Sequence, residues 1–102
     1  MEKKIIEKAL SYYGERHQID KVIEESAELI QAISKMREYQ EVSCGDYTNE
    51  LRSNLITELA DVYITLEYVK IAYEIDENEL NNEIKFKINR LKERLEDERL
   101  FE

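Results

Sequence analysis

The near absence of the residues that build tight turns constrains this chain more than any other feature. Its 102 residues include no proline and only two glycines, while 38% of them are charged. A β-sheet needs a turn every few residues, and glycine and proline make many of those turns, so a sheet is not expected. The sequence therefore predicts an all-α fold of few, long helices, as one domain over residues 1–102.

Hydrophobic periodicity divides the chain into four helices. They are predicted at about 5–13, 17–39, 49–73 and 77–95. Gly14 is expected to cap the first helix, Thr48 or Asn49 to begin the third, and Asp76, with Glu79 three residues on, to begin the fourth. Residues 40–49 lose the period and are expected to form the one real loop, and the charged tail after residue 95 is expected to fray.

The third predicted helix is apolar on nearly all sides. One stripe along it comprises six residues: Leu55, Leu59, Val62, Leu66, Val69 and Tyr73. Ala60, Ile64 and Ile71 fall on the opposite side, which a surface facing solvent does not normally tolerate. Because a chain of this length has too little of itself to cover both sides, the pattern predicts a homo-oligomer.

Carboxylates interrupt this apolar helix. Glu58 and Asp61 stand three residues apart, so both project to the same side, and Glu25 and Glu28 repeat that spacing on the preceding helix. If the two helices pack antiparallel, all four face one another. Oxygen-only, carboxylate-rich sites suit hard divalent cations, Mg²⁺ first and Mn²⁺ second, and Mg²⁺ typically binds together with substrate phosphates. For the run from Glu24 to Glu28, a solvated helix face is the alternative interpretation.

The charge balance limits the classes of partner. A formal net charge of −9 argues against nucleic acid or an anionic membrane surface. The lone Cys44 suits a reducing compartment and excludes an internal disulfide. We find neither a signal peptide nor a stretch long enough to span a bilayer. These features predict a soluble, cytoplasmic domain.

At this point the residues match a known pattern. The run EESAE at 24–28, followed by ELAD at 58–61, resembles the E-E-x-x-E and E-x-x-D signature of the MazG-like all-α nucleoside triphosphate pyrophosphohydrolases. The flanking residues extend the likeness over roughly residues 13–94: Tyr13-Gly14 and Gln18 before the first cluster, the helix after Asp61, and Lys85 with Asn89 on the last helix.

The resemblance implies a four-helix bundle that assembles as a dimer or tetramer. It also implies Mg²⁺-dependent hydrolysis of a (deoxy)nucleoside triphosphate to the monophosphate and pyrophosphate, as nucleotide-pool house-cleaning. The family pattern assigns roles to these positions: Glu25, Glu28, Glu58 and Asp61 hold the metal, Glu24 and Glu28 assist the attacking water, and Gln18, Lys85 and Asn89 contact substrate.

Several alternatives stay open from the sequence. One alternative is a non-catalytic, acidic helical interaction protein with a vestigial metal cluster. Another is hydrolysis of a related substrate such as phosphoribosyl-ATP. Gln18 is equally well a plain surface glutamine, and His17 is better explained as a capping or surface residue than as a phosphate ligand. The tyrosines at 12, 13, 63 and 68 suit base stacking but are expected in the core or at an interface.

Overall fold

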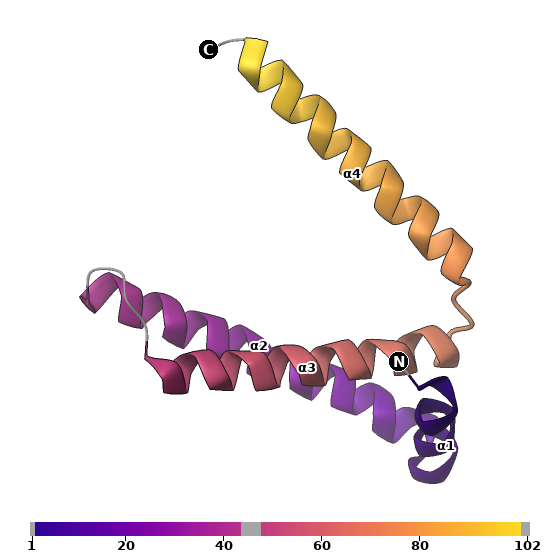
Figure 1. Ribbon diagram of the computed structural model, residues 1–102. Helices are drawn as coiled ribbons and strands as arrows, with labels where there is room; N and C mark the ends of the chain where they lie inside the picture. Colours follow the sequence, from indigo (N-terminus) through magenta and orange to yellow (C-terminus); the bar gives the residue numbers. More distant parts are fainter. Residues whose placement is uncertain (1, 44–47, 101–102) are drawn as a thin grey trace.

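The computed structural model describes residues 2–43 and 48–100, and every regular element within them is a helix (Figure 1). The four helices are α1 (Lys3–Tyr13), α2 (Glu15–Ser43), α3 (Asn49–Ala72) and α4 (Glu77–Leu100). The prediction of an all-α chain with four helices is therefore confirmed. Within the described residues, no helix is both long and apolar enough to cross a membrane.

Gly14 ends α1, as predicted. Its backbone has φ of +94°, a conformation that a side chain would disfavour, and its N–H donates to the carbonyl of Leu10 at 3.0 Å. The single glycine suffices for the corner, because α2 begins at the next residue, Glu15. The second helix is thus longer at both ends than predicted, and residues 40–43 of the expected loop are helical. The remainder of that loop, around Cys44 and Gly45, lies outside the described residues.

The helices α2 and α3 run antiparallel and side by side, and α1 packs across one end of the pair (Figure 1). Thr48 caps α3, because its hydroxyl accepts a hydrogen bond from the backbone N–H of Leu51 at 3.1 Å. The core between these three helices is small. Its buried apolar residues are Ile6 of α1, Ala32 and Met36 of α2, and Tyr68 of α3.

The face that α3 turns toward α2 is not the most apolar one. Thr65 and Tyr68 are its buried residues, whereas Leu66 and Tyr73 of the predicted stripe are 46% and 60% exposed. At 100° per residue, the buried face is rotated by roughly 60° from the predicted stripe. Glu58 and Thr65 lie toward its centre. Polar groups therefore occupy the interface within the chain, and much of the apolar stripe is left uncovered.

The joint between α3 and α4 is a Schellman motif. The N–H of Ile75 donates to the carbonyl of Lys70 at 2.8 Å, and the N–H of Glu74 donates to that of Ile71 at 3.3 Å. Glu74 occupies the left-handed position, with φ of +52°, where glycine is the usual residue. Asp76 then accepts from the N–H of Asn78 at 3.1 Å, which confirms Asp76 as the cap of α4.

An ion-pair network spans the same joint. The ammonium of Lys70, in the last turn of α3, lies 2.7 Å from a carboxylate oxygen of Glu77 in the first turn of α4 and 3.2 Å from one of Glu67. The hydrogen bond to Glu77 raises the pKa of Lys70 above its ordinary value, and the contact with Glu67 adds to this effect. Burial of the ammonium lowers the pKa but does not cancel the increase. The direction in which α4 leaves α3 is therefore specified by both backbone and side-chain contacts.

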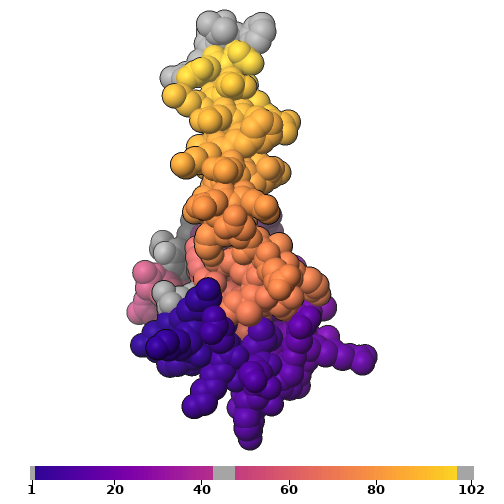
Figure 2. Space-filling view, turned by 90° about the vertical axis from the view of Figure 1, so that its right-hand side faces the viewer, coloured from indigo at the N-terminus to yellow at the C-terminus, as the bar shows by residue number. Residues whose placement is uncertain are grey.

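The fourth helix stands away from the other three. Among the described residues, α4 makes no helix-to-helix packing contact with α1, α2 or α3, and it projects as an arm (Figures 1 and 2). The radius of gyration is 18.1 Å, against about 13 Å for a compact chain of this length. A single chain thus forms a three-helix body with a projecting helix, and the predicted four-helix packing is not made within it.

Candidate metal centre

Three carboxylates from α2 and α3 converge in the middle of the antiparallel pair. Glu25, Glu58 and Asp61 each offer an oxygen, and these oxygens lie within 4.8 Å of one another; all three residues are half-buried. The spacing of three residues on α3 and the antiparallel packing produce this convergence, as the sequence predicted. Glu28, the fourth predicted ligand, is more exposed and borders the three.

The carboxylates act strongly on one another. Burial, followed by the negative charges of Glu28 and Asp61, raises the pKa of both Glu25 and Glu58 above the ordinary carboxyl value. The cluster thus concentrates negative charge that a bound cation would neutralise.

Two oxygen atoms in the cluster are left without a partner. The Oε2 atoms of Glu25 and Glu58 are buried and accept no hydrogen bond. A buried polar atom without a partner is costly, and in native proteins it usually indicates a bound water or ion. Two ligands of one Mg²⁺ ion are at most about 4.2 Å apart, so closure by less than about 1 Å would let the converging oxygens of Glu25, Glu58 and Asp61, which lie within 4.8 Å of one another, share an ion. The donor set fits a hard divalent cation.

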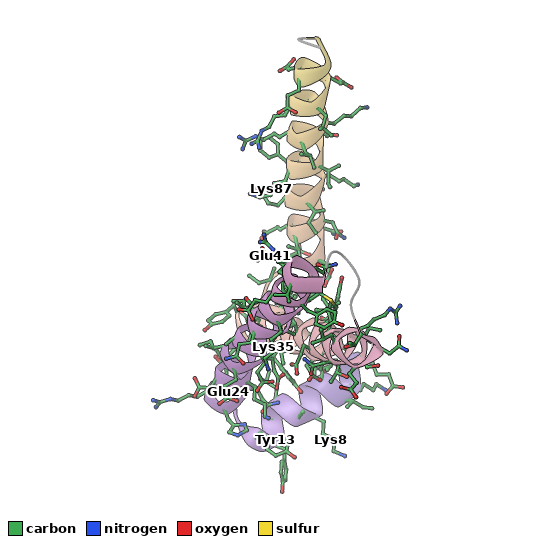
Figure 3. The ribbon with its side chains drawn as sticks, turned by 90° about the vertical axis from the view of Figure 1, so that its left-hand side faces the viewer. Lys8, Tyr13, Glu24, Lys35, Glu41 and Lys87 are labelled. Carbon is green, nitrogen blue, oxygen red and sulfur yellow. The ribbon has the colours of Figure 1, made fainter. Side chains whose placement is uncertain are left out.

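The predicted catalytic and substrate residues lie at different distances from this cluster. Glu24 is exposed on α2 beside Glu25, and its position along α2 can be followed in Figure 3. Lys85 and Asn89 are exposed on α4, which the chain does not fold back onto α2 and α3. The structure therefore brings Glu25, Glu58 and Asp61 together, with Glu28 beside them, but does not bring Lys85 or Asn89 to them within one chain.

Gln18 is not a surface residue. Its side chain is 2% exposed, and its carbonyl Oε1 lies 2.8 Å from Nδ1 of His17. Since a carbonyl oxygen only accepts, the contact places the imidazole proton on Nδ1. Gln18 lies seven residues before Glu25 and so occupies the same face of α2, about 10 Å away along the helix axis. The interpretation of Gln18 as a plain surface glutamine is therefore wrong.

An aromatic column at the α1–α2 corner was not predicted. The rings of Tyr12 and Tyr13 meet edge to face, with centroids 4.9 Å apart. The ring of Tyr13 stacks on that of His17, at 5.7 Å and an interplanar angle of 25°. Tyr12 and Tyr13 are 79% and 58% exposed, so neither belongs to the core of the chain, whereas Tyr68 does. A sequence signal existed: three rings at positions 12, 13 and 17 flank a helix-ending glycine.

A separate cavity of about 540 Å³ lies at the joint between α3 and α4, where α1 also contributes to its wall. Lys70 and Glu77 form part of the lining, together with Ile6 and Ile71. None of the four predicted metal ligands borders this cavity. Its lining is explained by the ion pairs that hold the joint.

Comparison of the chain with protein-family models, with curated proteins and with solved structures gives no match. The functional argument therefore depends on the residues and on their geometry.

Proposed function

We propose that this protein is a Mg²⁺-dependent nucleotide pyrophosphohydrolase, which hydrolyses a (deoxy)nucleoside triphosphate to the monophosphate and pyrophosphate. The observation that carries the proposal is the convergence of Glu25, Glu58 and Asp61, with two buried oxygens that lack a partner. The resemblance of EESAE and ELAD to the MazG-like signature supports the same conclusion. The chain would act on the nucleotide pool of the cytoplasm.

The residues of the cluster suit this chemistry. Bound Mg²⁺, with Mn²⁺ as a substitute, would neutralise phosphate charge and allow the acidic site to accept an anionic substrate. Glu25, Glu58 and Asp61 would hold the ion, with Glu28 as a further ligand. Glu24 and Glu28 would accept a proton from the attacking water, and their exposure on α2 supports this role because water reaches both.

The exposed surface supports a homo-oligomer. A compact monomer of 12.2 kDa exposes about 6,100 Å², whereas this chain exposes 8637 Å². The excess is about 2,500 Å², which is of the order that a stable dimer or tetramer buries for each chain. The uncovered stripe of α3 and one face of α4 are apolar. On α4 this face comprises Leu80, Ile84, Ile88, Leu91 and Leu95.

Assembly through α4 would also complete the site. At 100° per residue, Ile88 lies at one edge of the apolar face, and Lys85 and Asn89 lie about 60° and 100° beyond that edge, on the same side of the helix. Residues 85–94 carry five basic residues and one acidic residue, whereas the carboxylate cluster is acidic. We therefore infer that α4 of one chain packs on the α2–α3 pair of another and brings Lys85 to the outer phosphates and Asn89 beside them as a neutral donor.

The second candidate function is a non-catalytic interaction protein. The apolar faces of α3 and α4 and the net charge of −9 favour it, because the same surfaces would receive a basic, amphipathic helix of another protein. Under this alternative, the carboxylate cluster is vestigial.

Pyrophosphate release separates the two functions. Purified protein is incubated with Mg²⁺ and a panel of nucleoside triphosphates, and we expect release that depends on the metal. Glu58→Gln removes a ligand and should lower the rate by about 100-fold or more, with unchanged helical circular dichroism. Glu38→Gln, the same change at an exposed site on α2, should retain activity. An inert wild-type chain whose melting temperature does not respond to Mg²⁺ would favour the interaction protein.

A further inference from the structure

Functional groups follow one another in a definite order from the end of α1 through the N-terminal half of α2. The aromatic column of Tyr12, Tyr13 and His17 comes first, at the corner that Gly14 makes. The buried amide of Gln18 follows. Two turns later come the carboxylates, beginning with Glu24. Figure 3 shows Tyr13 and Glu24 around the lower part of the body, where α1 meets α2.

His17 is the end of the column that faces the acidic cluster along the chain. It is seven residues from Glu24 and eleven from Glu28, so the three share one face of α2. The rise along the helix is about 10 Å from His17 to Glu24, the proposed proton acceptor, and about 12 Å from His17 to Glu25, the first proposed metal ligand. An exposed ring and a carboxylate cluster at these separations match the two ends of a nucleotide, in which a flat base is joined through a sugar to a chain of phosphates.

The aromatic column is exposed to solvent, so packing in the core does not explain it. Tyr13 is 58% exposed and His17 is also exposed, yet the rings are aligned within 25° of parallel. The hydrogen bond from Nδ1 to the buried Oε1 of Gln18 fixes the orientation of the imidazole. A ring held in this way is a preformed stacking surface, since its rotamer does not have to be ordered when a ligand binds. Nucleobases stack on aromatic side chains whatever their hydrogen-bonding groups.

We propose that the base of the nucleotide substrate stacks on His17 and extends the column that Tyr12 and Tyr13 begin, so that His17 is a substrate-binding residue. The inference rests on the proposed function, because it takes the carboxylate cluster as the phosphate end. Stacking supplies affinity for any nucleobase. Gln18 acts as a positioning residue, because it is buried and holds His17.

Proton NMR of the imidazole tests this directly, because His17 is the only histidine of the chain. The protein with Mg²⁺ is titrated with an α,β-imido nucleoside triphosphate, which resists cleavage at the proposed bond, and separately with inorganic tripolyphosphate, which has no base. We expect an upfield shift of the His17 ring protons with the nucleotide, and a much smaller shift with tripolyphosphate. Equal shifts with the two ligands would overturn the stacking proposal.

Two substitutions distinguish stacking from positioning. His17→Phe keeps a ring and loses the Nδ1 donor, whereas His17→Asn keeps a donor and loses the ring. If the base stacks on residue 17, the Asn variant should bind the nucleotide about tenfold more weakly and the Phe variant close to normally. The reverse order would show that the hydrogen bond to Gln18 matters and not the ring. Tyr63→Ala, at an exposed tyrosine of α3, is the matched control and should bind normally.

The two levels of the argument fail differently. If tripolyphosphate with Mg²⁺ neither binds nor raises the melting temperature, and no triphosphate is cleaved, the proposed function itself is wrong. If tripolyphosphate binds, but the nucleotide binds no more tightly and His17→Asn has no effect, only the base site at the column is wrong.

Discussion

The substitution Ile88→Asp on α4 should separate the proposed homo-oligomer into single chains. Ile88 is 58% exposed in one chain, and full burial of an isoleucine side chain contributes about 1.5–3 kcal/mol. Covering its exposed part therefore contributes about 1–1.7 kcal/mol. In a dimer with twofold symmetry each contact occurs twice, so the loss is about 2–3.5 kcal/mol. The dissociation constant should rise roughly 20- to 400-fold, and the buried aspartate charge should increase this effect.

Sedimentation velocity over a range of protein concentrations measures the effect, and the chain offers a matched control. Phe86 is 56% exposed and lies about 160° around α4 from Ile88, so Phe86→Asp makes the same kind of change on the opposite face. We expect Phe86→Asp to assemble as the wild type does and Ile88→Asp to dissociate, with equal helical circular dichroism. A wild-type chain that is monomeric at every concentration, or equal dissociation of both variants, would refute the reasoning.

Three further predictions concern stability and can be measured by thermal or chemical unfolding. Burial and neighbouring charges raise the pKa of Glu25 and Glu58. The contribution of these two carboxyl groups to the stability of the metal-free fold is therefore present at acidic pH and is lost as the pH rises through the raised pKa values. Glu58→Gln should stabilise the metal-free protein at pH 8 and have little effect near pH 4. Glu74→Gly should raise the free energy of unfolding by about 0.5–1 kcal/mol, because glycine relieves the left-handed φ at a modest cost in chain entropy, whereas no gain would mean that the joint is unstrained. Thr48→Ala should lower it by about 1 kcal/mol through loss of the cap of α3, and an unchanged value would show that water replaces the hydroxyl.

The carboxylate cluster could be predicted from sequence because its geometry is local. The spacing from Glu58 to Asp61 places both on one side of a helix, and a short connection favours antiparallel packing of α2 and α3. The caps at Gly14, Thr48 and Asp76 were predictable for the same reason, since each depends on residues within one turn.

Features that depend on tertiary packing could not be predicted in the same way. The apolar stripe through Leu66 and Tyr73 did not indicate which face of α3 contacts α2, because hydrophobicity shows that a surface is buried but not which partner covers it. The burial of Gln18 and the stacking of Tyr13 on His17 depend on the corner at Gly14. Hydrophobic periodicity identifies each helix from one stretch of sequence, so it does not show how two helices pack where they meet at one residue.

The four residues that join α3 to α4 have a consequence for how such chains diverge. A helix of 24 residues is about 36 Å long, so each degree of rotation at residues 73–76 displaces the far end of α4 by about 0.6 Å. Insertion of one residue in α4 just after the joint would turn the apolar face by about 100° and present Glu83, Arg90 and Arg94 in its place. Short changes here would give a different surface for assembly to an unaltered three-helix body, without a single substitution among the carboxylates.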